Sequence, residues 1–330
     1  MLLALLLLEL CCRLLPVSTA TYTGYHVAPN ILTYPPHHRF TIASGWDLKN
    51  AHHHQANNYG FLADHDFAFN PQAIGLVGDS FVEANMLPPH DRLAAQLEKA
   101  LGGQTVFALG GPGSSLLDYG ERIEFAHQTF GINQFVVVLE RGDIRQARCG
   151  SGHNHGPCFD PHSRSSRLLH QPAADWKKRL IRESALAQYV FSQLKVDPAK
   201  FWKQSASTSD SQGKATSVPD IDDSANEEML ISRLFFDRLE SIQPPPHVLF
   251  VTDADRKNLM NESSTAPDPL KQFKELAHRK AYAVIELDEP FRHFLHQGKL
   301  ILEVGPADSH WNAAAVQVVT KQIATQLKPR

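Results

Sequence analysis

The chain contains little cysteine and has no excess of either charge. Only 4 of its 330 residues are cysteines, and 32 Lys and Arg nearly balance 35 Asp and Glu, for a formal net charge of −3. Without a basic excess there is no electrostatic footprint for nucleic acid, so nothing indicates DNA or RNA as a partner. The apolar fraction of 42% is sufficient for a real core, in one α/β domain with insertions or in two small domains.

The longest apolar run is the leucine-rich N-terminus, residues 1–15. It is short for a membrane span, which needs about 20 residues. It is typical of a signal-peptide core, and Ser18-Thr19-Ala20 places small residues at suitable offsets for cleavage. A positively charged leader is lacking, so a longer anchor helix is the alternative. We expect residues 1–20 to be a signal peptide or membrane anchor and the protein to be exported, periplasmic or extracellular, or anchored to the inner membrane.

Two cysteines, Cys149 and Cys158, enclose a loop rich in glycine, histidine and asparagine. In an oxidising compartment such a pair is expected to form a disulfide. The alternative uses Cys149, His153, His155 and Cys158 as tetrahedral zinc ligands. Because that spacing is irregular for a zinc module, we expect no metal site.

Apolar runs alternate with helical patterns in the remaining sequence. The predicted strands are 73–78, 104–109, 134–140, 247–252 and 282–287, and the predicted helices are 90–101, 115–130, 225–240, 268–279 and 311–326. Alternation of this kind predicts a mostly parallel sheet of five strands covered by helices on both faces, a three-layer α/β/α sandwich. This domain is expected over 71–330, after a loop-rich segment over 21–70 in which His52-His53-His54 is a polar loop.

An insertion is predicted within this domain at about 144–224. Its first part is basic, with arginines at 145, 148, 164 and 167. We interpret this stretch as a solvated face; a lid, or a surface for acidic polysaccharide or anionic lipid, is the alternative. An amphipathic helix over 180–194 and a flexible loop over 205–223 are expected to follow.

A serine lies where the first predicted strand ends, in Gly78-Asp79-Ser80. At a sharp strand-to-helix turn one serine can present both its hydroxyl and its backbone N–H to a substrate. Near the C-terminus, Asp308-Ser309-His310 supplies a carboxylate and an imidazole, which complete the set that acyl transfer requires. The alternative is that Asp308 and Ser309 only cap a helix that begins near Trp311. Open parallel sheets bind ligands at the carboxyl ends of their strands, where these residues are expected.

These motifs resemble the GDSL/SGNH family of serine esterases and acyltransferases, over residues 57–143 and 247–325. The resemblance implies an SGNH, flavodoxin-like fold, with Ser80 as nucleophile, His310 as general base and Asp308 as the carboxylate that orients it. It also implies an oxyanion hole made by the N–H groups of Ser80 and Gly110, since the family spacing places a second glycine at Gly113.

Two acids are expected to support this site, Asp79 in the turn before the nucleophile and Asp143 after the third strand. The family has an asparagine just before the second of these acids, and its amide donates to the oxyanion. Gly142 stands at that position here. Losing such a donor costs about 10²–10³ in turnover. We consider four substitutes for this missing donor: a water, Arg141, Asn85 or a rearranged backbone N–H.

The last motif also departs from the usual pattern, because it is Asp-x-His and not Asp-x-x-His. Asp308-Ser309-His310-Trp311 is similar to the branch related to alginate O-acetyltransferases, in which the serine often follows the histidine in sequence. Here Ser80 precedes it.

The sequence therefore predicts an exported serine esterase of the SGNH type that hydrolyses an acyl ester, commonly acetyl, without metal or organic cofactor. Its expected partner is an acylated small molecule or polysaccharide. One alternative is a carbohydrate O-acetyltransferase that acts on a polysaccharide and receives acetyl groups from a membrane partner. The other is a binding module that keeps the fold without catalysis.

Overall fold

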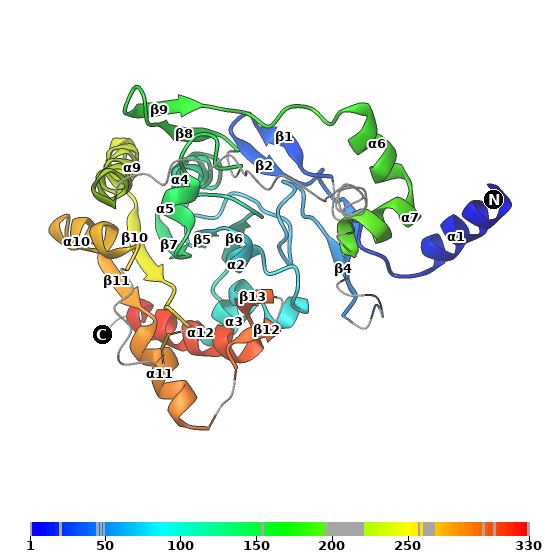
Figure 1. Ribbon diagram of the computed structural model, residues 1–330. Coiled ribbons are helices and arrows are strands. Elements are labelled where there is room, and N and C mark those ends of the chain that lie inside the picture. The colour runs from blue at the N-terminus through cyan, green and yellow to red at the C-terminus, as the bar shows by residue number, and fades with distance from the viewer. Residues whose placement is uncertain are drawn as a thin grey trace. The chain divides into compact units, whose positions relative to one another are not determined.

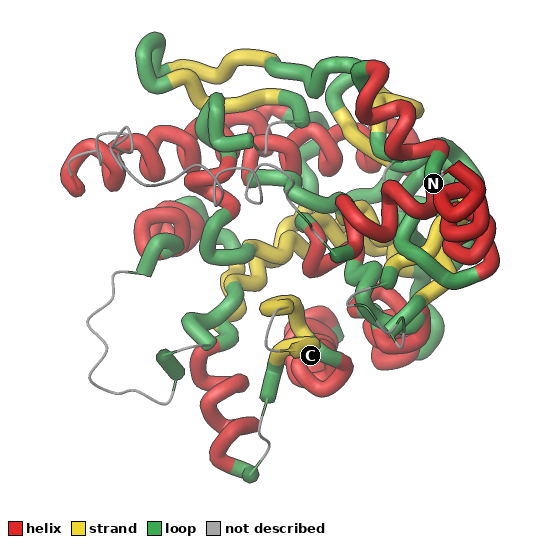
Figure 2. Tube along the Cα trace, turned by 45° about the vertical axis from the view of Figure 1, so that its right-hand side comes forward, coloured by secondary structure: helices red, strands yellow, loops and turns green. Residues whose placement is uncertain are grey.

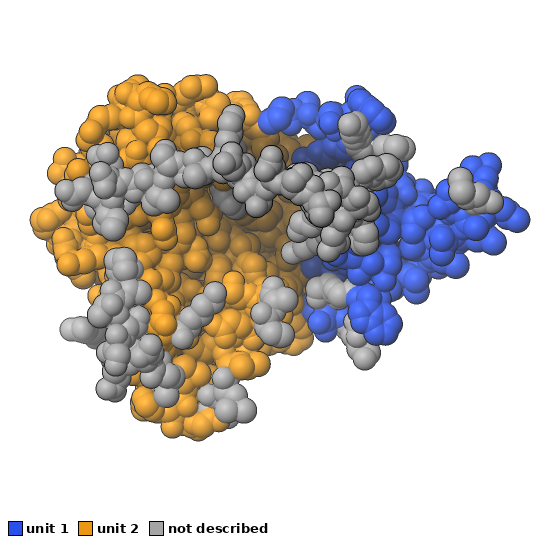
Figure 3. Space-filling model, in the orientation of Figure 1, with its two compact units in different colours: residues 1–22, 39–54, 172–224 blue, residues 23–38, 55–171, 225–330 orange. Residues whose placement is uncertain are grey.

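The computed structural model describes residues 2–19, 22–43, 46, 48, 50–152, 155–194, 196, 221–256, 258–259, 268–298, 301–305 and 308–328. The chain divides into two compact units, coloured separately in Figure 3. Unit 1 consists of Met1–Tyr22, Arg39–His54 and Pro172–Ser224; unit 2 consists of Thr23–His38, Gln55–Gln171 and Ala225–Arg330. The sequence-based boundaries at residues 20 and 70 remain predictions.

A sheet of five strands forms the centre of unit 2 (Figures 1 and 2). Its strands are β5 (Ile74–Gly78), β6 (Val106–Gly110), β7 (Gln134–Leu139), β10 (His247–Thr252) and β11 (Ala283–Glu286). They are all parallel, in the order β11-β10-β7-β5-β6. The predicted fold class is confirmed, and this order places the topological switch point between β5 and β7, where open sheets of this kind bind ligands.

Side chains of the sheet alternate between two apolar clusters, which are the two faces. On β7, Phe135, Val137 and Leu139 belong to one cluster, together with residues of α4 (Leu116–Phe130), α9 (Ile221–Ser241) and α10 (Lys271–Arg279). Val136 and Val138 belong to the other, with residues of α3 (Leu93–Ala100), α11 (Asp288–His296) and α12 (Ala313–Leu327). Both faces of the sheet are thus covered by helices (Figure 1), which explains why its strands are nearly continuous apolar runs.

The covering helices agree with the predicted ones to within about four residues at each end. They are α3 (Leu93–Ala100), α4 (Leu116–Phe130), α9 (Ile221–Ser241), α10 (Lys271–Arg279) and α12 (Ala313–Leu327). Helix α11 (Asp288–His296) and the short helices α2 (Ser80–Glu83) and α5 (Asp143–Gln146) were not predicted. The helix predicted over 90–101 is divided at the extended residue Arg92 into the 3₁₀-helix η1 (Pro89–Asp91) and α3. Since α9 begins at Ile221, the loop predicted over 205–223 is wrong at its end; residues 205–220 lie outside the described residues.

Three two-stranded sheets accompany the central sheet in unit 2. They pair β1 (Gly24–Ala28) with β2 (Ile31–Thr33), β8 (Pro157–Asp160) with β9 (Ser165–Leu168), and β12 (Glu303–Gly305) with β13 (Asp308–Trp311). The segment before β5 is ordered: the Asn57 side chain accepts hydrogen bonds from the N–H groups of Tyr59 and Phe61, at 2.9 and 3.0 Å. Phe67 stacks on Phe107 of β6, with ring centroids 4.2 Å apart.

Unit 1 contains α1 (Leu2–Leu14), β3 (Arg39–Ile42), β4 (His52–Gln55), α6 (Trp176–Glu183), α7 (Ala185–Ala187) and the π-helix η2 (Gln188–Gln193). Two sequence predictions are wrong here. The single helix over 180–194 is interrupted at Ser184, which is extended and caps the N–H of Ala187. His52-His53-His54 is not a loop but strand β4, paired with β3. Among the described residues, no helix is both long and apolar enough to cross a bilayer.

Candidate active site

Ser80 is the first residue of α2 and follows β5 after a single residue. Asp79 caps this helix, and its Oδ1 accepts a hydrogen bond from the N–H of Phe81 at 2.8 Å. The first N–H groups of a helix have no acceptor inside the helix, and Ser80 is at the first helical position. The Asp79 cap binds the N–H of Phe81 and not that of Ser80. The turn thus presents both the hydroxyl and the backbone N–H of Ser80 beyond the carboxyl end of β5.

Ser80, His310 and Asp308 lie in one hydrogen-bonded line. The Oγ of Ser80 is 2.8 Å from Nε2 of His310, and Nδ1 of His310 is 2.5 Å from Oδ1 of Asp308. Since an ionised carboxylate only accepts hydrogen bonds, Nδ1 carries the proton and Nε2 accepts the hydroxyl proton of Ser80. Asp308 and His310 follow Ser80 by 228 and 230 positions in sequence, and the fold brings the three side chains together. They have the geometry of a nucleophile, a base and an orienting acid.

Asp308 and His310 lie on strand β13, not at the start of a helix. The alternative in which Asp308 and Ser309 cap α12 is therefore wrong. Asn312 caps that helix, and its side chain accepts a hydrogen bond from the N–H of Ala315 at 2.9 Å. The Asp308 carboxylate instead accepts from the backbone N–H of His310 at 3.1 Å, which fixes the carboxylate beside the ring it orients.

A buried ion pair at the end of β10 holds the strand that carries His310. Arg256 donates to both the Asp253 carboxylate, at 2.9 and 3.1 Å, and the backbone oxygen of Ser309, at 2.6 Å. Asp253 also accepts from Nε1 of Trp311 at 2.9 Å. The guanidinium lies over the ring of Phe81, 5.5 Å from its centroid, so the same arginine contacts the element that carries the nucleophile.

Gly110 ends β6 and is paired in register with Gly78 at the end of β5. A Cβ on Gly110 would lie 2.4 Å from the backbone N of Glu83 and 2.9 Å from the carbonyl carbon of Val82. Glycine is therefore required for the backbone of α2 to pass the end of β6. The loop that follows is braced by buried Arg122, which donates to the hydroxyl of Ser114 in the loop at 2.6 Å and to the backbone oxygen of Leu109 on β6 at 2.7 Å.

The two predicted supporting acids are both buried beside the nucleophile turn. Burial, and repulsion from Glu140, raise the pKa of Asp79 to about 6, against the hydrogen bond from Phe81. Burial, followed by repulsion from Asp79 and Glu140, raises the pKa of Asp143 well above its usual value. Asp143 accepts from the Tyr119 hydroxyl at 2.8 Å and from the N–H of Glu140 at 2.7 Å. Both acids thus hold the turns after β5 and β7.

A third buried acid, Glu83, lies at the end of α2. Burial raises its pKa to about 7, although hydrogen bonding from Tyr34 and the charge of Arg92 favour ionisation. Asn85 donates to Oε2 of this carboxyl group at 3.0 Å, whereas its Oε1 has no hydrogen-bond partner within the described residues.

Gly142, at the position where the resemblance implies an asparagine, lies in the turn between β7 and α5. Two of the side chains considered as substitutes are occupied elsewhere. Arg141 forms ion pairs with Asp255 at 3.3 Å and Asp268 at 3.9 Å. Asn85 donates to Glu83.

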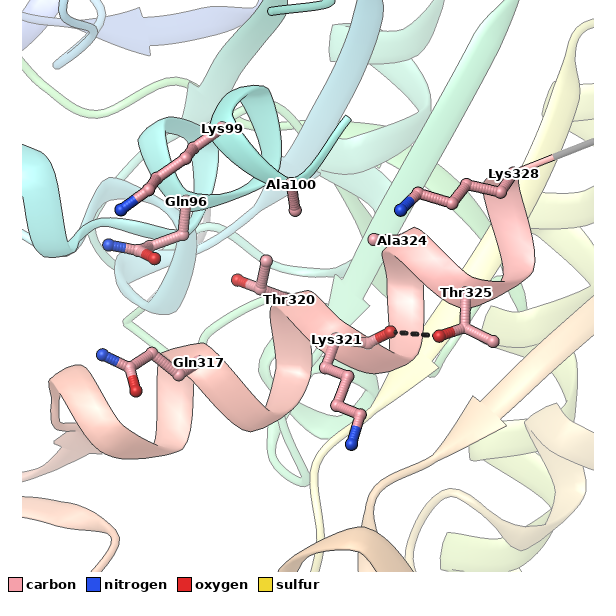
Figure 4. A pocket seen from close by; sticks show the side chains of 9 residues that line it. All are labelled: Gln96, Lys99, Ala100, Gln317, Thr320, Lys321, Ala324, Thr325 and Lys328. Carbon is pink, nitrogen blue, oxygen red and sulfur yellow. Dashed lines mark hydrogen bonds between the residues drawn. The ribbon is translucent and has the colours of Figure 1, made fainter. Parts of the chain in front are cut away.

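A cavity of about 230 Å³ lies beside the site, at the ends of β7 and β10. Its lining is polar and charged, and includes Glu140, Arg141, Asp253, Arg256, Glu303 and Ser309. A second cavity of about 450 Å³ lies between α3 and α12 (Figure 4). It is lined by lysine, glutamine, threonine and alanine, and none of the triad residues contributes to it.

The expected cysteine pair is joined: Cys149 and Cys158 form a disulfide. Of the four residues considered as zinc ligands, His153 lies outside the described residues. Within the described part of the chain no cluster of His, Cys, Asp or Glu is arranged to hold a metal ion. In the basic stretch, Arg145 and Arg148 pair with Glu228 and Glu227 of α9, at 3.7 and 3.1 Å.

The sequence did not predict a role in the site for three residues, Asp253, Arg256 and Arg122. Asp253 directly follows a predicted strand, as Asp79 does, and that position was its only signal. Arg256 and Arg122 have no local signal, because each acts through a contact that only the folded chain creates.

Several solved structures resemble this chain over most of its length at low identity. A member of the lipolytic protein G-D-S-L family from Veillonella parvula is 11% identical, with a TM-score of 0.42 over 77% of this chain and 97% of that one. A two-domain esterase active on acetylated mannans is 10% identical, with a TM-score of 0.40 over 78% of this chain and 51% of that one. An acetyl xylan esterase from the rumen bacterium Butyrivibrio proteoclasticus is 9% identical, with a TM-score of 0.36 over 79% of this chain and 64% of that one.

The first of these belongs to the family that the motifs resemble. No family model matches the chain, and no curated protein matches its sequence. At such low identities and TM-scores these similarities say nothing about substrate, and the functional conclusion depends on the geometry of the site.

Proposed function

We propose that the protein is a serine esterase of the SGNH type, with Ser80 as nucleophile, His310 as general base and Asp308 as its orienting acid. The observation that carries this proposal is the continuous line from Ser80 Oγ to His310 Nε2, at 2.8 Å, and from His310 Nδ1 to Asp308, at 2.5 Å. A serine is activated as a nucleophile when a base within hydrogen-bond reach accepts its proton and a third group fixes that base.

In the proposed reaction Ser80 Oγ attacks the ester carbonyl carbon while its proton passes to His310 Nε2. The carbonyl oxygen becomes an oxyanion, which accepts hydrogen bonds from the N–H groups of Ser80 and Gly110. Collapse breaks the ester C–O bond, and the imidazolium gives its proton to the departing alcohol. A water then attacks the acyl-enzyme in the same way, which releases the acid and restores Ser80.

The lining of the adjacent cavity supports a short acyl group on a polar alcohol. About 230 Å³ lined by two arginines, several carboxylates and a serine suits hydroxyl-rich ligands better than a long hydrocarbon chain. We therefore take an acetyl ester of a small polar molecule or of a polysaccharide as the substrate class. A sugar hydroxyl in place of the second water would make the same site an O-acetyltransferase.

The test is hydrolysis of p-nitrophenyl acetate by wild type, Ser80→Ala, His310→Ala and Asp308→Asn. Removing a triad member is expected to lower kcat by about 10⁴-fold or more. Ser166→Ala on β9 and Asp237→Asn on α9, both at exposed positions, are matched controls that should keep wild-type rates. Equal rates for wild type and Ser80→Ala would overturn the proposal, and acetyl-enzyme that reacts faster with an oligosaccharide than with water would identify the transferase.

We also propose that the protein is exported. A disulfide between Cys149 and Cys158 is typical of oxidising compartments, and the leucines of α1 are mostly exposed. N-terminal sequencing of protein recovered from separated cell fractions tests this. A chain that begins near residue 21 outside the cytoplasm indicates a cleaved signal, an intact chain in the membrane fraction indicates an anchor, and intact reduced protein in the cytoplasm contradicts export.

A further inference from the structure

The place of the missing family asparagine is filled by another side chain. A Cβ on Gly142 would lie only 2.6 Å from Nε2 of Gln146 and 2.8 Å from Oε2 of Glu140, which accepts a hydrogen bond from the N–H of Gly142 at 2.6 Å. The amide nitrogen of Gln146 and this carboxylate oxygen therefore share the volume into which a side chain at 142 would extend. The half-buried Gln146 is the last residue of α5. Where the family has the carboxamide of an asparagine, this chain thus has the carboxamide of Gln146.

Helix geometry explains how Gln146 reaches this position. Residues 142 and 146 are four apart, and the N–H of Gln146 donates to the oxygen of Gly142 at 2.9 Å, which closes one helical turn between them. Side chains in a helix incline toward its N-terminus, so a residue at i+4 covers the surface above residue i. Glutamine is one methylene longer than asparagine and carries the same pair of amide donors.

This amide lies at the edge of the sheet where the nucleophile is. Strands β5 and β7 are direct neighbours, with Val77 paired to Val137, so the turns that follow them adjoin. The carboxyl group of Asp79, in the turn after β5, lies close enough to Asp143, after β7, to raise the pKa of Asp143. This is the switch point of the sheet, where the oxyanion would form if Ser80 attacks an ester.

We infer that Gln146 supplies the oxyanion donor that asparagine supplies in the family, by donating a hydrogen bond from Nε2 to the oxygen of the tetrahedral intermediate. The inference rests on the proposed esterase function. It requires no rearrangement of Arg141 or Asn85, whose side chains are held by carboxylates. Three donors, from Ser80, Gly110 and Gln146, then surround the oxyanion.

The test compares kcat and KM for p-nitrophenyl acetate in wild type, Gln146→Ala, Gln146→Glu and the double variant Gly142→Asn/Gln146→Ala. Gln146→Ala should lower kcat by about 10²-fold with little change in KM, as expected for a donor that acts mainly in the transition state. Gln146→Glu retains the shape without the donor and should be equally impaired. The kcat of the double variant should be at least tenfold higher than that of Gln146→Ala, because the asparagine at position 142 returns an amide to the place where Gln146 had one.

Unfolding temperatures identify any variant that has merely lost its fold, and Gln128→Ala on α4 is the matched control. Recovery by Gly142→Asn is a result that a purely structural role for Gln146 would not give. Wild-type kcat in Gln146→Ala, with Ser80→Ala inactive, would overturn the role of Gln146 and leave the esterase intact. No difference in turnover between wild type and Ser80→Ala would overturn both.

Discussion

Arg256 donates a hydrogen bond from Nη1 to the backbone oxygen of Ser309, at 2.6 Å. Ser309 stands between Asp308 and His310, so this contact fixes the peptide that joins the acid to the base. The same guanidinium binds Asp253 through two nitrogens and lies over Phe81, the residue after the nucleophile. One buried side chain therefore connects the strand that carries the base to the helix that carries the nucleophile.

Replacing Arg256 should accordingly impair catalysis without touching a triad residue. Arg256→Lys retains the charge but cannot bind Asp253 and Ser309 together through a planar fork. We expect kcat to fall about 10- to 100-fold, with a smaller change in KM, because misplacement by about 1 Å costs catalysis on this scale. Steady-state kinetics measure this fall in kcat. The control is Arg279→Lys, at an exposed arginine at the end of α10. Equal kcat in the two variants would mean that Arg256 does not position the site.

Gly110 should tolerate no side chain. In Gly110→Ala the new Cβ would meet the backbone of Glu83 at 2.4 Å, and backbone atoms cannot move aside as the end of a flexible side chain can. We expect a loss of about 1–3 kcal/mol in the free energy of unfolding and a displaced α2. Denaturant unfolding measures the first. Gly305→Ala, where an added Cβ meets no atom within 4 Å, is the control and should unfold as wild type does.

Glu83 should make stability depend on pH. Its pKa rises from the usual 4.5 to about 7 on folding, so between these values the folded protein holds a proton that the unfolded chain has lost. The free energy of unfolding should therefore fall as pH rises from 4.5 to 7, by up to about 3 kcal/mol, and level off above pH 7. Glu83→Gln cannot lose that proton and should lack the part of the fall that Glu83 contributes. Asp79 and Asp143, whose pKa values are also raised, contribute their own fall in both proteins.

Unfolding of wild type and Glu83→Gln in urea across pH 4 to 8 provides the comparison. Glu275→Gln, an exposed glutamate on α10, controls for the change of net charge. A difference between wild type and Glu83→Gln that stays constant over this range would refute the raised pKa.

The disulfide should stabilise the fold without taking part in the reaction. It closes a loop with a sequence separation of 9 residues, a length for which cross-linking contributes about 2–3 kcal/mol by restricting the unfolded chain. Cys149→Ser/Cys158→Ser should lower the unfolding free energy by about that amount and leave kcat nearly unchanged. Calorimetry with parallel kinetics decides this; a large loss of kcat at a temperature where the variant is folded would place the loop in the site.

The sequence alone was sufficient to predict the sheet and to single out Ser80, Asp308 and His310, whose side chains lie within hydrogen-bond distance of one another. Strands such as Phe135-Val136-Val137-Val138 are buried on both faces, so they are continuous apolar runs that need no tertiary information to recognise. Ser80 belongs to a short motif at the end of such a strand, where parallel sheets bind ligands. Asp308 and His310 were singled out by their motif, and they lie on β13, outside the parallel sheet.

The remainder depended on contacts between distant residues. Strand β13 exists because Trp311 pairs with Glu303, and four residues of mixed polarity give no periodicity of their own. The helix predicted over 180–194 is interrupted where Ser184 caps the next turn, a local competition that an amphipathic pattern does not reveal. Arg256 reaches Ser309 across 53 positions, so its role could not be predicted from its neighbours.

The measurement that tests the central claim most directly is labelling of the purified protein with a fluorophosphonate probe, followed by peptide mass mapping. The account predicts one label per molecule on Ser80, lost in Ser80→Ala and in His310→Ala and retained in Ser166→Ala. Absence of label on wild type, under conditions that mark a control esterase, would contradict an activated serine and leave a binding role for the fold.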